Sequence, residues 1–84
     1  MSLTVVVQEA ALRALARIRP EDKETFAAIR QALSALANQP RPEQAVAWGG
    51  SGIYRLRLPG VRILYELDEG AATVYLINVA LTAR

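Results

Sequence analysis

The chain has 84 residues, with ten Lys and Arg against eight Asp and Glu, and a formal net charge of +2. Its hydrophobic content of 52% predicts one compact domain over residues 1–84 and argues against disorder. Cysteine and histidine are absent, which excludes disulfides, thiolate nucleophiles, the commonest zinc ligands and a Ser-His-Asp triad. No apolar run approaches the ~20 residues of a membrane span, and no signal peptide is recognisable. We therefore expect a cytoplasmic protein that needs no cofactor, metal or membrane partner.

The first half of the chain predicts a strand followed by two antiparallel helices. Leu3–Val7 is a short β-branched run, as in a buried strand. Gln8–Arg19 has helical periodicity, and we expect Pro20 to end this helix and to start a second one that fades near Asn38. The acids after Pro20 suit the N-terminus of the second helix, and they are Glu21, Asp22 and Glu24. The predicted core stripes of the two helices are Leu12, Leu15 and Ile18, and Phe26, Ile29, Leu33 and Leu36.

Residues 39–52 contain two prolines and three glycines and predict one substantial loop. Trp48 lies inside it, and we expect this side chain to anchor the loop through hydrophobic contacts, with base stacking as the alternative. The Gly49-Gly50-Ser51-Gly52 run is not a phosphate loop, because no Gly-Lys-Ser/Thr follows and the next element is a strand. The run instead predicts a flexible entry to the strands that follow.

Two alternating strands joined by a Pro-Gly turn come next, over Tyr54–Leu58 and Val61–Tyr65. Placing the Pro-Gly dipeptide at the centre of the turn sets Arg57 directly opposite Arg62. Because side chains two apart share a face, Arg55 lies on the same face as these two arginines. The opposite face then pairs apolar side chains, namely Leu58 with Val61, Leu56 with Ile63, and Tyr54 with Tyr65.

The placement of these arginines on one face of the hairpin indicates a binding site. Facing like charges destabilise a strand pair, so a purely structural hairpin gains nothing from Arg57 beside Arg62. Arginine presents a planar fork of donors that binds phosphate in a bidentate manner. We therefore interpret Arg55, Arg57 and Arg62 as a site for a local anionic partner, with phosphate as the ligand.

The end of the chain completes a small sheet. Asp68-Glu69-Gly70 marks a tight turn, and Thr73–Leu81 is apolar on both faces, which is typical of a central strand. The order strand–helix–helix–strand–strand–strand predicts an α+β fold. We expect a four-stranded, mainly antiparallel twisted sheet with a helical hairpin packed on one face. The sheet residues expected to meet the two helical stripes are Leu56, Ile63 and Tyr65.

In order and spacing these elements resemble the RelE/ParE toxin superfamily of bacterial type II toxin–antitoxin systems. The resemblance covers nearly the whole chain: a basic strand at Tyr54–Leu58, a glycine turn, an Arg-hydrophobic-hydrophobic-Tyr strand within Gly60–Asp68, and a closing strand at Val74–Val79. It implies a RelE-like fold and a cognate antitoxin that wraps over the exposed helix faces or adds a strand to the sheet edge. RNA-cleaving members of the superfamily cut mRNA in the ribosomal A site, where the 2′-hydroxyl attacks the adjacent phosphate.

The resemblance also implies roles for residues. Arg55 and Arg57 match the family's basic residues before the turn and Arg62 the arginine after it, as RNA-binding and catalytic groups that hold the scissile phosphate and stabilise its developing charge. Thr82 stands where a further arginine is expected, which leaves Arg84 as the last catalytic candidate.

No Tyr or His follows Arg84, so the acid/base partner is either missing or supplied by Glu66, a tyrosine of the sheet or the ribosome. Apart from this role, Glu66 is expected to be a solvated strand-end residue, and Tyr54 and Tyr65 to belong to the core.

Three functions remain open at this point. The first is a RelE-like, ribosome-dependent endoribonuclease, or mRNA interferase, which the clustered arginines favour. The second is a ParE-like toxin that poisons DNA gyrase by binding alone, although ParE-like chains usually have a longer C-terminal tail. The third is a degenerate member that only binds its antitoxin.

Overall fold

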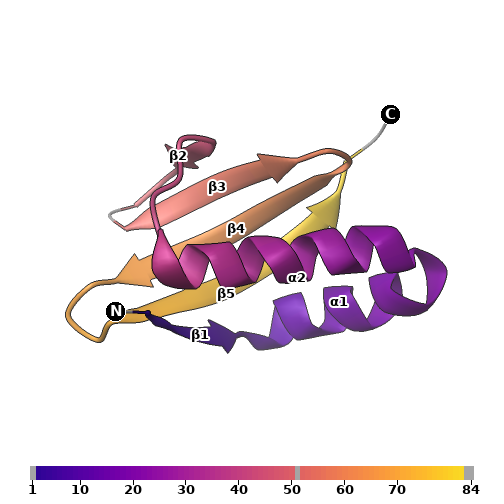
Figure 1. Ribbon diagram of the computed structural model, residues 1–84, viewed down its shortest axis with the longest axis horizontal. Helices are drawn as coiled ribbons and strands as arrows, with labels where there is room; N and C mark the ends of the chain where they lie inside the picture. Colours follow the sequence, from indigo (N-terminus) through magenta and orange to yellow (C-terminus); the bar gives the residue numbers. More distant parts are fainter. Residues whose placement is uncertain (1, 51, 83–84) are drawn as a thin grey trace.

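The computed structural model describes residues 2–50 and 52–82, and within them five strands form one sheet (Figure 1). In chain order the elements are β1 (Thr4–Val7), α1 (Glu9–Glu21), α2 (Lys23–Asn38), β2 (Ala45–Ala47), β3 (Ile53–Leu58), β4 (Val61–Asp68) and β5 (Thr73–Leu81). The strand order is β1-β5-β4-β3-β2; β1 and β5 are parallel, and the other neighbouring pairs are antiparallel. The α+β class and the interior position of β5 are confirmed.

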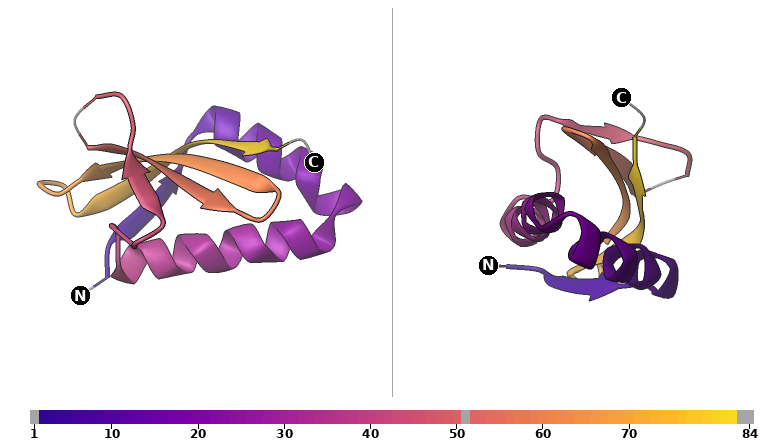
Figure 2. Two further views of the ribbon diagram at one scale, coloured as in Figure 1. Left: turned by 90° about the horizontal axis from the view of Figure 1, so that it is seen from above. Right: turned by 90° about the vertical axis from the view of Figure 1, so that its right-hand side faces the viewer.

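The helical hairpin packs on one side of a twisted sheet, as Figures 1 and 2 show. The core lies between them: Ile29 and Leu36 come from α2, and Ile63, Tyr65 and Leu76 come from the strands, each at most 1% exposed. Full burial of one such aliphatic side chain stabilises the fold by about 1.5–3 kcal/mol. The other face of β3 and β4 has no helix over it, and this is the face that carries the arginines.

The expected sheet of four strands is wrong by one strand. Ala45–Ala47 lies inside the segment predicted to be a loop, but it pairs antiparallel with β3 and forms the short edge strand β2. Three residues are too few to give a clear alternation in the sequence, and their pairing depends on the neighbouring strand β3. Residues 39–44 connect α2 to this strand, as expected of a loop.

The predicted core stripe of α1 is wrong at Leu12, whose side chain is 58% exposed. The buried positions are Ala11, Ala14 and Ile18, so the helix is rotated by one residue from the leucine stripe, and Leu15 is only partly buried. The helix packs against β5, and two of its three buried residues are alanines. Small side chains let a helix lie close to a sheet, which is compatible with alanines at the inward-facing positions. The α2 stripe is confirmed: Ile29 and Leu36 are buried, and Phe26 and Leu33 pack against the core.

The boundary between the helices lies two residues later than predicted. Pro20 is inside the last turn of α1, which continues to Glu21. Asp22 then leaves helical geometry and caps α2, with its Oδ1 accepting from Thr25 N at 3.0 Å and its Oδ2 accepting from Thr25 Oγ1 at 2.6 Å. Of the three acids expected at this N-terminus, Glu21 therefore belongs to α1. Neither helix is long and apolar enough to cross a membrane.

Candidate functional site

The β3–β4 hairpin has the register predicted from its turn, with Arg57 opposite Arg62 and Leu56 opposite Ile63. Pro59 and Gly60 occupy the two central turn positions, and Gly60 has a φ of 76°. Proline followed by a positive-φ residue is the pattern of a type II turn, which glycine adopts without strain. Gly60 also accepts a hydrogen bond from Thr82 N at 3.0 Å, so the residue after β5 is held beside the turn.

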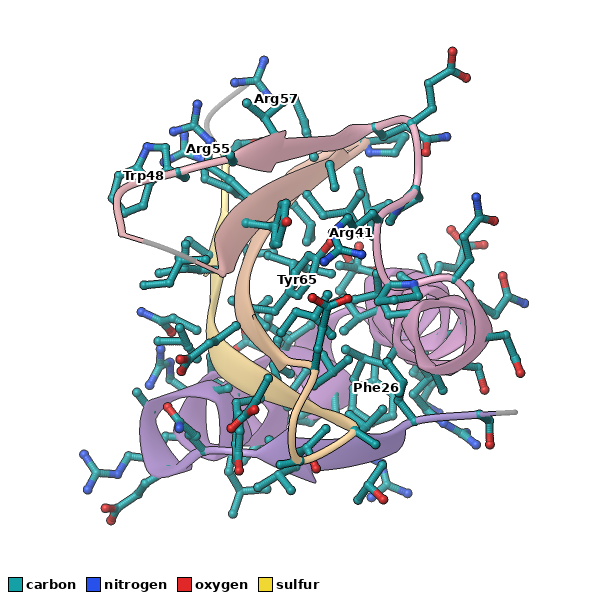
Figure 3. All side chains as sticks on the ribbon, turned by 90° about the vertical axis from the view of Figure 1, so that its left-hand side faces the viewer. Phe26, Arg41, Trp48, Arg55, Arg57 and Tyr65 are labelled. Carbon is teal, nitrogen blue, oxygen red and sulfur yellow. The ribbon has the colours of Figure 1, made fainter. Side chains whose placement is uncertain are left out.

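Three arginines lie on the sheet face opposite the helices. Figure 3 shows Arg55 and Arg57 directed away from the side on which Tyr65 lies, and the register places Arg62 beside Arg57. Arg57 and Arg62 are exposed and Arg55 is half-buried. The ion pairs of the described residues are Arg13–Glu9 and Arg41–Glu69, so none of these three guanidiniums has a carboxylate partner there. The predicted cluster is confirmed as a spatial arrangement.

A depression of about 510 Å³ lies at the turn end of this face. It is lined by Arg57, Leu58, Pro59, Gly60, Arg62 and Thr82. Directly opposed side chains in an antiparallel pair have Cβ atoms about 4.5–5.5 Å apart, so one anion can reach both guanidiniums. An anion held there relieves their repulsion and accepts charge-assisted hydrogen bonds. Among the described residues, the lining has no carboxylate or phenol, so they can stabilise negative charge there but include no side chain suited to general acid/base catalysis.

A second, smaller depression adjoins the first. Its volume is about 150 Å³, and it is lined by Trp48, Arg55, Arg62, Leu64, Asn78 and Ala80. Arg62 belongs to both depressions, which therefore form one continuous surface around that side chain.

Trp48 is not the buried loop anchor that we expected, because 47% of its surface is exposed. Trp48 N donates to Ile53 O at 2.9 Å, which continues the pairing of β2 with β3 by one residue. Strand alternation then turns the indole to the arginine face. The Arg55 guanidinium lies 5.7 Å from the centre of its ring. The sequence signal that could have located it is the apolar run Ala45-Val46-Ala47-Trp48, which indicates a strand.

The tyrosines at the centre of the sheet face the helices, as expected for core residues. Tyr54 and Tyr65 stack with ring centres 5.5 Å apart. Tyr65 Oη donates to Pro40 O at 2.7 Å, and Tyr54 Oη accepts from Arg41 Nε at 3.0 Å. Burial raises the pKa of Tyr65 from 10.0 to about 12; Tyr54 adds to the rise and Arg41 opposes it. Both hydroxyls are therefore engaged on the far side of the sheet from the arginines.

The remaining acid/base candidates lie away from the turn. Glu66 pairs with Ile53 and Tyr75, so it shares the arginine face with Tyr75, but it is roughly 13 Å along β4 from Arg62. It is partly buried and precedes the end of the strand by two residues. Arg84 lies outside the described residues, and its predicted role is untested.

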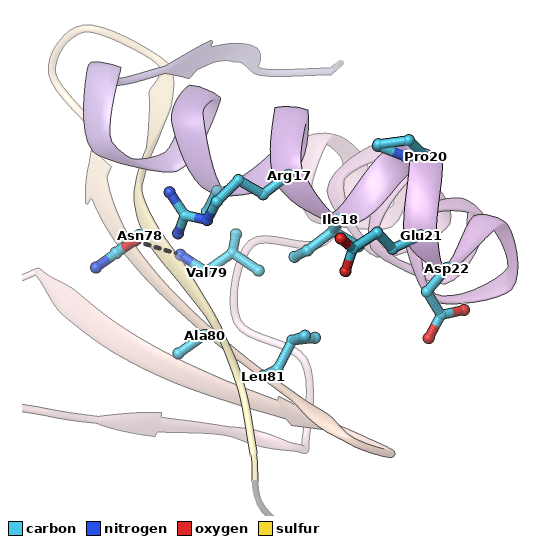
Figure 4. Close-up of a pocket in the computed structure, with 10 residues that line it drawn as sticks. Arg17, Ile18, Pro20, Glu21, Asp22, Asn78, Val79, Ala80 and Leu81 are labelled. Carbon is cyan, nitrogen blue, oxygen red and sulfur yellow. Dashed lines mark hydrogen bonds between the residues drawn. The ribbon is translucent and has the colours of Figure 1, made fainter.

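A larger hollow lies elsewhere, between the C-terminal half of α1 and the end of β5 (Figure 4). It measures about 830 Å³, and Arg17, Ile18 and Glu21 on the helix face Asn78–Leu81 on the strand. β1 pairs only with Thr73–Leu76, so the later part of this strand edge faces the groove instead of another strand. The groove joins a helix surface to a sheet edge.

Comparison with known proteins identifies the family. The model of the family described as "ParE toxin of type II toxin-antitoxin system, parDE" matches residues 5–84. The chain belongs to the ParE toxin family. It is a toxin of a type II toxin–antitoxin system within the RelE/ParE superfamily, as the resemblance implied. No curated protein matches the sequence.

Solved structures confirm the RelE-like fold of this ParE-family chain. The isolated RelE toxin of E. coli superposes with a TM-score of 0.85 at 20% identity, covering 99% of this chain and 87% of that one. A chain of the archaeal RelE–RelB complex from Pyrococcus horikoshii OT3 superposes with a TM-score of 0.85 at 19% identity, covering 100% of this chain and 99% of that one. A chain of the RelBE2 toxin–antitoxin complex of Mycobacterium tuberculosis superposes with a TM-score of 0.80 at 22% identity, covering 98% of this chain and 100% of that one. At these identities the likeness concerns the fold.

The pKa of Tyr65 predicts how stability changes with pH. The unfolded chain loses this proton near pH 10 and the folded chain only near 12, so the stabilisation by the neutral hydroxyl is complete below pH 10 and is lost between these values. Tyr65→Phe should be less stable by about 0.5–1.5 kcal/mol at neutral pH, because the hydrogen bond to Pro40 is lost. Urea unfolding on both sides of pH 10 should show this deficit narrowing as the pH rises. A deficit that stays constant would contradict the assignment.

Proposed function

We propose that this ParE-family toxin is an endoribonuclease that inhibits translation by cleaving mRNA in the ribosomal A site. The observation that carries the proposal is the pairing of Arg57 with Arg62 across the hairpin, with no carboxylate partner among the described residues. Two like charges in this position cost stability in the free protein, and a bound phosphate removes that cost. The fold shared with E. coli RelE adds support.

The roles follow from the geometry of the two depressions. Arg57 and Arg62 hold the scissile phosphate at the turn, and Arg55 lies one side-chain position further along the same face. The 2′-oxygen bonds to phosphorus as the bond from phosphorus to the 5′-oxygen breaks, which leaves a cyclic phosphate. Negative charge grows on the non-bridging oxygens during this step, and the two guanidiniums stabilise it.

Proton transfer needs a group from outside this depression. The 2′-hydroxyl gives up a proton and the departing 5′-oxygen takes one, but a guanidinium does neither readily near neutral pH. We assign the transfer to a group of the ribosome, which would make cleavage depend on the ribosome.

A second function is favoured by the family match itself, which names ParE. In that case the toxin poisons DNA gyrase by binding alone, and the arginine face is a docking surface without chemistry. Among the residues that the structure describes, no acid/base side chain lines the depression around Arg57 and Arg62, which is compatible with this alternative.

Induction of the wild-type chain and of Arg62→Ala separates the functions. Mapping of mRNA 5′ ends should show new cuts within codons for the wild type, and about 100- to 1,000-fold less cleavage for Arg62→Ala, since one transition-state donor is lost. Thermal unfolding should show that Arg62→Ala is as stable as the wild type or more stable by about 0.2–1 kcal/mol. Arg13→Ala removes an exposed arginine from α1 and is the matched control, with full cleavage expected.

Two results would contradict the nuclease. Intact mRNA together with a DNA-damage response would support gyrase poisoning. Normal growth with intact mRNA and no damage response would support a member that only binds its antitoxin.

We further propose that a cognate antitoxin covers α1 and the adjoining strand edge. Leu12 and Leu81 are each 58% exposed and Val6 is 39% exposed, and the groove of Figure 4 lies between the helix and the end of β5. A helix can cover exposed leucine on α1, and an extended segment can pair with a free strand edge. The superposed chain from M. tuberculosis comes from a complex of toxin and antitoxin, which is compatible with such a partner.

The exposed leucine of α1 gives the test of this surface. Leu12→Asp should weaken binding to the antitoxin at least fivefold, because a desolvated leucine contact would be replaced by a charge. Its melting temperature and its toxicity without antitoxin should be unchanged, since Leu12 contributes little to the core. Titration calorimetry measures the affinity, and Arg13→Ala on the same helix should bind normally. Equal affinity of Leu12→Asp and the wild type would exclude this face of α1.

A further inference from the structure

Trp48 is the single tryptophan of the chain, and the fold leaves it exposed beside the arginine cluster. A large aromatic side chain that is 47% exposed on a small domain loses the stabilisation that burial would give. Its indole is nevertheless held in position: the backbone pairing to Ile53 fixes its direction, and the Arg55 guanidinium lies 5.7 Å from the ring centre. The core therefore does not explain its position, whereas a ligand on this face would.

The depression beside Trp48 has the size and lining of a site for one planar ring. A closed cavity of about 150 Å³ binds benzene. This depression has that volume but is open to solvent, so it can receive part of a planar base while the rest of the base stays outside. Leu64 and Ala80 supply apolar lining, while Trp48 and Arg55 supply two planar groups on which a ring can stack. No acid is among the described residues that line it, so a ligand with attached negative charge is favoured.

Asn78 adds a hydrogen-bond donor to this lining. Its Oδ1 accepts from Val79 N at 2.8 Å, as Figure 4 shows, which fixes the orientation of the amide. The Nδ2 group donates no hydrogen bond to the described residues and is available to an acceptor on a ligand. An amide of this kind recognises the ring nitrogens and carbonyl oxygens on the edges of nucleobases.

We propose that the depression is a nucleobase subsite for single-stranded RNA. The base stacks against Trp48 and Arg55, Asn78 Nδ2 donates to an acceptor on its edge, and its phosphate reaches Arg62. Because Arg62 also lines the depression at the turn, the recognised base lies next to the phosphate held by Arg57 and Arg62. The inference rests on the proposed function for the nature of the ligand, and it adds a residue that selects among bases.

A protein partner is the competing occupant, since Trp and Arg are common at the centres of protein interfaces. The small volume of the depression, its three positively charged or planar groups and the adjoining phosphate-sized site together favour a nucleotide.

The single tryptophan makes stacking directly observable by fluorescence. Titration of the purified chain with a short oligoadenylate should quench Trp48 emission in a saturable manner, because a stacked base contacts the indole. Inorganic tripolyphosphate carries similar charge without bases and should cause no comparable quenching. Anisotropy of a labelled oligoadenylate measures binding independently of the tryptophan.

Substitutions of Trp48 test how much this side chain contributes to the affinity for oligoadenylate. Trp48→Ala should bind oligoadenylate about five- to 150-fold more weakly, the range for loss of one stacked base, and Trp48→Phe should recover much of the affinity. Val46→Ala is the matched control: Val46 is an exposed apolar residue of β2 on the same face, outside the lining of the depression, and its removal should change neither affinity nor quenching.

The outcomes separate this inference from the proposed function. Quenching with loss of affinity in Trp48→Ala supports the subsite, even if mRNA mapping finds no cleavage. Binding by anisotropy without quenching and with unchanged affinity of Trp48→Ala overturns the subsite, and leaves the nuclease to be decided by the mapping. The subsite is also overturned if the chain does not bind oligoadenylate at all. It is likewise overturned if Trp48 emission is quenched by gyrase or by the antitoxin but not by oligoadenylate.

Discussion

The register of the β3–β4 hairpin determines what each face of this small sheet carries. A shift by one residue would turn Leu56 and Ile63 to solvent and bring Arg57 and Arg62 against the helices. The Pro59-Gly60 turn prevents that shift, because its two central positions suit these residues and Gly60 has a positive φ. The apolar face then binds the helical hairpin, and the core stabilises a charge arrangement that the hairpin alone would disfavour.

As a consequence, the two faces of the sheet have different roles. Burial of Ile29, Leu36 and Tyr65 on the helix face supplies stability, so the opposite face can hold arginines without carboxylate partners. Arg62 joins the depression at the turn to the depression beside Trp48, so an anion and a planar ring can be bound side by side. The family match establishes a toxin of a type II toxin–antitoxin system. Under the proposed function, this face is the part of the fold that binds mRNA.

The sequence predicted features that depend on local pattern and missed those that depend on packing. The Pro-Gly turn with alternating flanks gave the hairpin register and hence the arginine cluster, because both follow from a period of two. The prediction for Leu12 was wrong because α1 buries Ala11 and Ala14 instead, and periodicity alone does not distinguish a buried alanine stripe from a leucine stripe. The strand β2, and with it the exposure of Trp48, exists only through pairing with β3.

The central claim is that Arg57 and Arg62 are held together for a shared anion, and a double-mutant cycle on unfolding free energy tests it most directly. Without added anion, comparison of the wild type, Arg57→Ala, Arg62→Ala and the double variant should give an unfavourable coupling of about 0.2–1 kcal/mol. With saturating inorganic tripolyphosphate, the wild type should gain stability that each single variant lacks, so the coupling should become favourable. A coupling that is the same with and without the anion would contradict the account.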